Sequence, residues 1–185
     1  MIQNRDLIKA VFDNDVMKYN DWFFKADWEK AEIIELEDNN WIRVKNIIWN
    51  NGTWRNGYWE NGIWKDGVWE NGIWKNGAWE NGLWKHGWWE KGTWISGTWK
   101  NGTWEDGTWK YGIWYNGTWE KGAWKDGNWY DGVWKNGQWY DGIWKNGTWK
   151  NGTWKRGRIY DAKTKEYIES KVPPNKCKWS LSYGK

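Results

Sequence analysis

Between residues 49 and 157 the hydrophobic and polar positions of the chain repeat with a period of five. Trp stands at every fifth position from Trp49 to Trp154, and Gly at every fifth position from Gly52 to Gly157. The unit is (N/D)-G-x-W-z, where x is mostly Thr, Ile, Val or Ala, and z is mostly Lys, Glu or Tyr. A period of five fits neither a long helix nor the unbroken alternation of a long strand. The pattern therefore predicts short extended segments joined by regular corners.

The glycines mark the corners. A glycine in every repeat indicates a backbone position with positive φ or a close approach, and Asn or Asp before it tolerates the same backbone region. Between corners, x-W-z is predicted to be a three-residue extended piece. Its Trp points to one side, and x and z point to the other.

Two architectures use such a unit. The stretch "WENGLW", Trp79 to Trp84, has the composition of a two-residue type I′ hairpin, which when repeated gives an antiparallel meander of very short strands. In that meander, the first and last residues of each three-residue strand direct their backbone N–H and C=O groups to the same neighbouring strand. Hydrogen bonds to both neighbours would therefore require a bulge in every strand. A single-chain β-solenoid avoids this problem and encloses the Trp row. The sequence therefore predicts an all-β solenoid, with the meander as the alternative.

Burial of the indole rings favours the solenoid strongly. One Trp removes about 200 Å² from water, roughly 5 kcal/mol at about 25 cal/mol per Å². The predicted structural core consists of the tryptophans that recur with the repeat: Trp54, Trp59, Trp64, Trp69, Trp74, Trp79, Trp84, Trp89, Trp94, Trp99, Trp104, Trp109, Trp114, Trp119, Trp124, Trp129, Trp134, Trp139, Trp144 and Trp149.

Position z alternates between basic and acidic residues with a period of ten from Arg55 to Glu90. In a coil of ten or twenty residues this alternation stacks like charges, at a cost of only tenths of a kcal/mol per exposed contact. The period of ten predicts an even number of repeats in each coil.

The G-x-W-x-N unit resembles the unit of pentapeptide-repeat proteins, in which a small residue stands two before a large central Leu or Phe. That resemblance implies a four-sided β-solenoid with twenty residues per coil. The array over residues 46–157 is also similar to the Gly-Thr-(Phe/Trp) pentads of predicted structural proteins of large tailed bacteriophages.

The two ends differ from the array and divide the chain into segments 1–45, 46–157 and 158–185. In the first, "DLIKAVF" suggests a short helix, and "AEIIELEDNNWIRVKNIIW" suggests two strands around a turn at residues 38–40. We expect this small α/β segment to cap the solenoid, to dock it to an assembly, or both. The last segment predicts a short hairpin, residues 158–160 with 166–168, followed by a basic tail.

Composition offers little chemistry. The chain has 28 basic and 24 acidic residues, so its net charge of +4 predicts no specific nucleic-acid surface. His86 replaces the usual Asn at a corner, and Cys177 lacks a second Cys or a nearby His. We expect no catalytic residue, no metal site and no cofactor. No secretory signal and no membrane-spanning stretch are evident.

The function expected is therefore that of a structural, non-catalytic protein. The phage resemblance implies a virion component, made in the host cytoplasm, that serves as a spacer, decoration or adaptor. Its partners would be other virion proteins, bound through segments 1–45 and 158–185, or further copies of the chain. The alternative is a carbohydrate- or receptor-binding surface, for which Tyr115, Tyr130, Tyr140 and Trp88 are the outward aromatics. The threonines Thr93, Thr98, Thr103 and Thr108 suggest ice binding, a weaker alternative.

Overall fold

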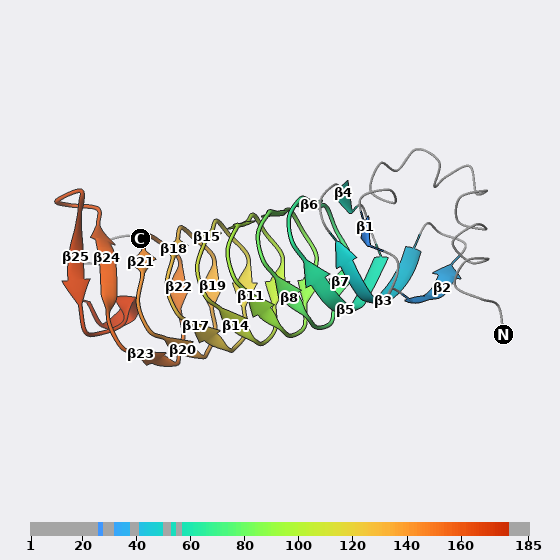
Figure 1. Cartoon of the computed structure of the whole chain (residues 1–185). Coiled ribbons are helices and arrows are strands. Elements are labelled where there is room, and N and C mark those ends of the chain that lie inside the picture. Colours follow the sequence, from blue (N-terminus) through green and yellow to red (C-terminus); the bar gives the residue numbers. More distant parts are fainter. Residues whose placement is uncertain (1–25, 28–31, 38–40, 50–52, 55–56, 178–185) are drawn as a thin grey trace.

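A computed structural model describes residues 26–27, 32–37, 41–49, 53–54 and 57–177. The helix expected in "DLIKAVF" lies outside these residues. The described chain winds into an elongated β-solenoid, with the array along its length and a hairpin at its C-terminal end (Figure 1). The predicted all-β solenoid is confirmed.

Each pentad contributes one two-residue strand, formed by x and Trp, rather than the expected three-residue piece. These strands are β4 (Thr53–Trp54), β6 (Val68–Trp69), β7 (Ile73–Trp74), β8 (Ala78–Trp79), β9 (Leu83–Trp84), β10 (Trp88–Trp89), β11 (Thr93–Trp94), β12 (Thr98–Trp99), β13 (Thr103–Trp104), β14 (Thr108–Trp109), β15 (Ile113–Trp114), β16 (Thr118–Trp119), β17 (Ala123–Trp124), β18 (Asn128–Trp129), β19 (Val133–Trp134), β20 (Gln138–Trp139), β21 (Ile143–Trp144), β22 (Thr148–Trp149) and β23 (Thr153–Trp154). The longer β5 (Gly57–Trp64) covers two pentads.

The strands form three flat faces. Face 1 is the column β4-β6-β9-β12-β15-β18-β21, face 2 runs from the first half of β5 through β7-β10-β13-β16-β19-β22, and face 3 from its second half through β8-β11-β14-β17-β20-β23. Every described pairing between array strands is parallel, as in Trp89 with Trp104. The antiparallel meander is therefore wrong.

The coil contains fifteen residues, three pentads, because the register joins each residue to the one fifteen positions later. The expectation of an even number of repeats is wrong, and so is the four-sided, twenty-residue coil implied by the pentapeptide-repeat resemblance. With three indoles per coil the rings close a triangle: Trp59–Trp64, Trp64–Trp69 and Trp59–Trp69 have centroids 6.0, 5.9 and 6.5 Å apart.

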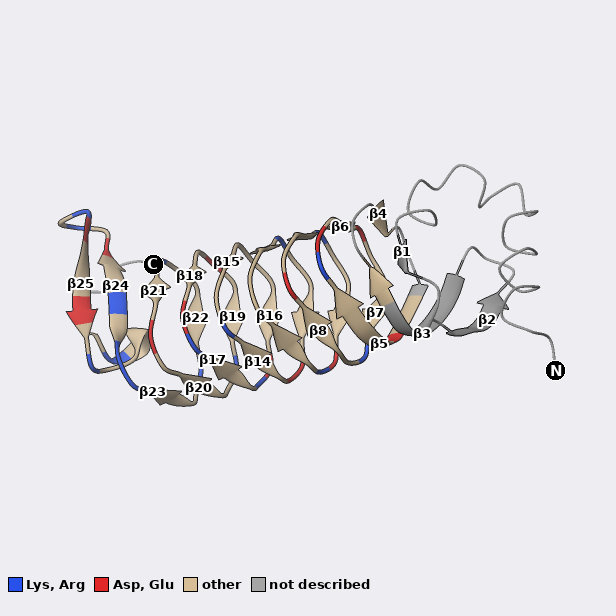
Figure 2. Cartoon of the chain, viewed as in Figure 1, with Lys and Arg blue, Asp and Glu red and all other residues tan. Residues whose placement is uncertain are grey.

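The alternation at position z gains a different meaning in this coil. An odd number of repeats offsets an alternation of period ten by one step per coil. Up to Glu90, where the alternation is unbroken, Lys therefore lies beside Glu rather than beside Lys. Lys75 Nζ lies 3.2 Å from Glu60 Oε1 and Lys135 Nζ lies 2.8 Å from Glu120 Oε1. Charges of both signs are interspersed along the coils (Figure 2). These exposed pairs contribute at most about 1 kcal/mol each, but they favour this coil over one that stacks like charges.

The Asn or Asp before each glycine has a role that the sequence did not suggest. The Oδ1 atoms of Asp106, Asn116 and Asp126 accept hydrogen bonds from the following glycine N–H at 2.7, 2.7 and 2.6 Å. Among the described residues other than glycine, only Lys165 has positive φ, so these corner residues do not share the glycine conformation. Their preference arises from this local hydrogen bond, which satisfies a backbone donor at the corner.

The core consists of three parallel columns of stacked indoles. Along face 3, Trp94 and Trp109 have centroids 4.7 Å apart and planes 5° apart, and neighbouring columns meet edge to face, as Trp104 and Trp109 do at 6.0 Å and 74°. Both arrangements are favoured by the aromatic quadrupole. All twenty tryptophans expected in the core are buried, together with Trp49 and Trp154.

At the N-terminal end, β3 (Trp41–Trp49) pairs in parallel with β5 and places Trp49 beside Trp64. The strands β2 (Glu32–Glu37) and β1 (Ala26–Asp27) pair antiparallel with β3. The two strands predicted around residues 38–40 are thus present. They cover an edge of the first coil that would otherwise be open.

The C-terminal end carries the predicted hairpin, β24 (Gly157–Asp161) with β25 (Glu166–Ser170). The β24 strand continues face 1, where Ile159 takes the place of a tryptophan above Trp144. The Nε1 of Trp154 donates to the Ser170 carbonyl oxygen at 3.0 Å. The short 3-10 helix η1 (Pro174–Lys176) lies against β22. Together these segments cover the last indoles of the core.

Candidate functional site

The two residues that the sequence singled out for reactivity, His86 and Cys177, lie far apart in the fold. No group of three or more His, Cys, Asp or Glu side chains there could hold a metal ion. His86 stands at a corner between faces 1 and 2, and Cys177 is buried under the C-terminal end, 3.4 Å from Ser170 Oγ. The side chains on the outer faces of the solenoid are the next candidates.

The outward tyrosines form ladders with their neighbours. On face 1 the Tyr115 and Tyr130 rings stack at 5.0 Å, and Lys100 Nζ lies 4.0 Å from the Tyr115 centroid. On face 3, Lys125 Nζ lies 3.5 Å from the Tyr140 centroid. These contacts are cation–π and stacking interactions between successive coils. Because both faces of the Tyr115 ring are occupied, it offers a sugar only its edge.

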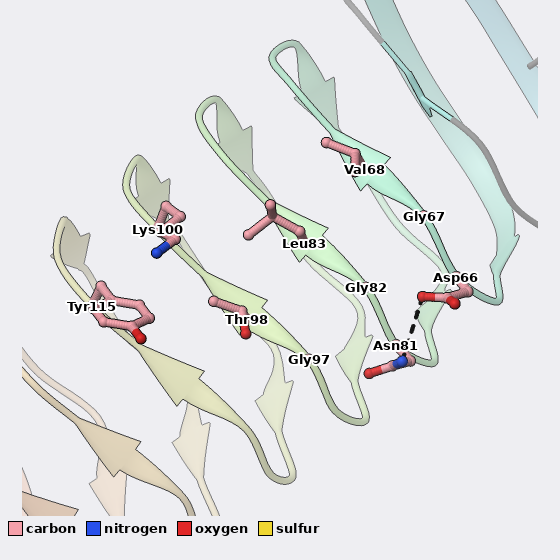
Figure 3. Close-up of a pocket in the computed structure, with 10 residues that line it drawn as sticks. All are labelled: Asp66, Gly67, Val68, Asn81, Gly82, Leu83, Gly97, Thr98, Lys100 and Tyr115. Atoms are coloured by element: carbon pink, nitrogen blue, oxygen red, sulfur yellow. Dashed lines mark hydrogen bonds between the residues drawn. The ribbon is translucent and has the colours of Figure 1, made fainter.

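A shallow hollow of about 580 Å³ lies on face 1 (Figure 3). Val68, Leu83 and Thr98 line its floor, while Lys100 and Tyr115 stand along one side. On the other side, the Asn81 amide donates to Asp66 at 3.4 Å. The hollow is open and of mixed polarity, and it lacks the few convergent polar groups that mark an enclosed small-molecule site.

The threonines that suggested ice binding do not share a surface. Thr98 lies on face 1, Thr103 on face 2, and Thr93 and Thr108 on face 3. On face 3 the pair is flanked by Ala78 and Ala123. No described face carries an extended, flat threonine row.

Trp88 differs from the other outward aromatics. It occupies position x of β10 on face 2, where its side chain is 48% exposed, and its Nε1 donates to Glu105 Oε2 at 3.1 Å. Sequence alternation alone indicated that this ring points outward. The Glu105 carboxylate lies at the edge of the ring because the coil length places Glu105 in the next coil, and the sequence alone did not predict that length.

No helix in the described part of the chain is long and apolar enough to cross a membrane.

Comparison with protein-family models, with curated proteins and with solved structures finds no significant match. The likeness to pentapeptide repeats therefore consists of the five-residue period and the solenoid fold, and no family membership follows from it.

Proposed function

We propose that this chain is a non-catalytic structural protein, a rigid spacer that holds its two end segments at a fixed distance and in a fixed relative direction. The observation that supports this function is the unbroken core: seven stacking steps join Trp49 to Trp154 along one column without a gap. Each coil also donates backbone hydrogen bonds to the one before, such as Leu83 N to Gly67 O at 2.8 Å.

The partners we propose are other proteins of a phage particle, or further copies of the chain, held through segments 1–45 and 158–185. The phage placement follows from the resemblance of the pentads alone. The end segments are favoured because they depart from the repeat, whereas several side chains on the array faces are engaged between coils, as Lys75 is with Glu60. Mass spectrometry of purified particles from the source tests the placement. Absence of the chain from them would overturn it without affecting the spacer.

The spacer role predicts how deletions act. Trp and Gly are the same in every pentad, so any whole number of pentads can be removed without breaking the core columns. Deleting residues 111–125 removes one coil and keeps the C-terminal hairpin on its original face. Deleting 111–120 removes two pentads and turns the hairpin by one face.

Spin labels distinguish the two deletions. Lys65 and Lys155 occupy the same column on face 3, so Lys65→Cys and Lys155→Cys, in a Cys177→Ser background, carry labels along one edge. Deleting 111–125 should shorten the distance between the labels by about 4.8 Å, one strand spacing. Deleting 111–120 should lengthen it, because the labels then lie on different faces.

The surface chemistry of the two deletions also differs. After removal of 111–125, Lys135 lies above Glu105, and a pair of opposite charges is retained. After removal of 111–120, Lys125 lies above Lys100, so like charges meet. Both variants should fold, the first slightly more stable by tenths of a kcal/mol. Unfolding of the 111–125 deletion would contradict the spacer function, since its length would then not be adjustable coil by coil.

In a particle, the 111–125 deletion should be incorporated at the normal copy number if the partners tolerate a shorter spacer. A variant lacking 158–185 should be lost from the particle. If a variant lacking both end segments still assembled, the array faces would be the binding surface instead.

A further inference from the structure

The alternation of basic and acidic residues at position z is interrupted once and then reversed; we call this interruption, at Ile95, the fault. The alternation runs without interruption from Arg55 to Glu90, is broken by Ile95, and resumes at Lys100 in the opposite phase. Since column neighbours are fifteen residues apart, the reversal places Glu90 next to Glu105 on face 2. Glu120 follows in the same column, where it is paired with Lys135 at 2.8 Å. Glu90, Glu105 and Glu120 thus stand in three consecutive coils of this column, whereas before Glu90 the column alternates Glu60 with Lys75.

Trp88 lies at this fault. Ile73 and Thr103 precede and follow it on face 2, and the usual residue at position x is Thr, Ile, Val or Ala. Glu90 is two residues along the same strand direction, so its side chain points to the same side as that of Trp88. Glu105 accepts the Trp88 indole N–H at 3.1 Å. Among the tryptophans whose side chains the structure describes, Trp88 is the one that is exposed.

These groups favour a cation. The face of an indole attracts an ammonium or guanidinium group, and Trp is the strongest of the aromatic residues in this interaction. Donation of the indole N–H to a carboxylate increases the electron density of the ring and strengthens the attraction. Glu105 supplies an acceptor at the edge of the ring, and Glu90 precedes Glu105 in the same column. Lys75, which precedes Glu90 in the same column, forms an ion pair with Glu60 at 3.2 Å. Lys91 follows Glu90 at the next corner.

We propose that Trp88, Glu90 and Glu105 form a lateral docking site for an arginine side chain of a partner protein. Arginine fits better than lysine because its planar guanidinium can stack on the indole while it donates to two carboxylate oxygens. Trp and Arg are also the residues that most often dominate the affinity of protein interfaces. The site is independent of the end segments and adds a contact along the side of the spacer.

The test uses N-acetyl-L-arginine amide as the probe and the ¹⁵N-labelled indole N–H signals of the folded protein as the readout. The Trp88 signal is identified by its loss in Trp88→Thr, a variant that carries the commonest type of residue at position x and should fold normally. We expect the arginine amide to shift the Trp88 signal saturably. The neutral citrulline amide of the same shape should shift it little, because the interaction requires the positive charge.

Two substitutions in one column separate binding from folding. Glu105→Lys places a lysine between Glu90 and Glu120, so it should keep or raise the melting temperature while weakening arginine-amide binding about tenfold or more. Glu120→Gln is the matched control, because that carboxylate is already paired with Lys135, and it should change the affinity less than about twofold. If the adjacent glutamates affected only folding, Glu105→Lys would change the melting temperature but leave the titration of the Trp88 signal by the arginine amide unchanged.

Three results would overturn the proposal. The first is no saturable shift with the arginine amide at the wild-type site. The second is an equal shift with the citrulline amide, which would show that charge is not recognised. The third is a shift with a neutral oligosaccharide but none with the arginine amide, which would make Trp88 a sugar-stacking platform.

Discussion

Replacing Gly107 by valine will disrupt the middle of the solenoid, although Gly107 lies far from both ends. Its φ is +122°, and a Cβ built there would lie 2.3 Å from Gly92 O and 3.0 Å from Gly92 N. Both atoms belong to the backbone of the preceding coil, so no side-chain rotation relieves the clash. A β-branched residue is also strained at positive φ. We expect a loss of at least about 4 kcal/mol in stability.

Denaturant melts followed by circular dichroism measure this loss. The control is Thr108→Val at the next residue, because valine occupies the equivalent outward position in Val68 and Val133. That change should cost less than about 0.5 kcal/mol. A Gly107→Val protein with the wild-type melt would show that the coils are farther apart than the structure places them.

The second large effect is expected from Trp109→Ala, which should cost about 3–5 kcal/mol. The Trp109 ring stacks on Trp94 at 4.7 Å and on Trp124 at 4.8 Å, and it meets Trp104 and Trp114 edge to face at 6.0 Å. Its removal leaves a cavity bounded by four rings that are held by their own coils. The cavity cannot collapse without breaking the interstrand register.

Trp109→Phe is the informative comparison. It keeps an aromatic ring in the column and removes an indole N–H for which the described residues provide no hydrogen-bond partner. We expect about half the loss of the alanine variant, because the smaller cavity is partly offset by removal of an unsatisfied polar group. The second control, Trp88→Ala, should cost less than about 1 kcal/mol since that ring is exposed. Equal losses for Trp88 and Trp109 would contradict the core assignment.

The sequence predicted the solenoid and its tryptophan core because Trp and Gly recur at every fifth position. It predicted the C-terminal hairpin because the repeat ends at Gly157 and a different pattern follows. The number of pentads per coil could not be obtained from Trp or Gly, since both are present in every pentad and therefore allow any whole number. Only position z carries that information. In coils of ten or twenty residues the charges at position z stack like on like at small cost, whereas the fifteen-residue coil pairs Lys75 with Glu60.

The candidate sites depend on the coil length in the same way. Alternation along a strand showed that Tyr115, Tyr130 and Trp88 point outward. Which residues they meet is decided fifteen positions away, so the Tyr115–Tyr130 stack and the Trp88–Glu105 hydrogen bond required the structure. The local hydrogen bond from the Gly107 N–H to Asp106 Oδ1 could in principle have been predicted, because Asx side chains commonly accept from nearby backbone donors.

The sameness of Trp and Gly in every pentad has a consequence for how such a gene can change. Each pentad is encoded by a whole number of codons, and neighbouring pentads have similar sequences, so copying slippage would add or remove complete pentads in frame. The core columns accept every such change. Selection on the direction of the end segments would instead accept only changes by three pentads. Lineages of this chain should therefore differ in length by multiples of fifteen residues wherever both ends stay attached.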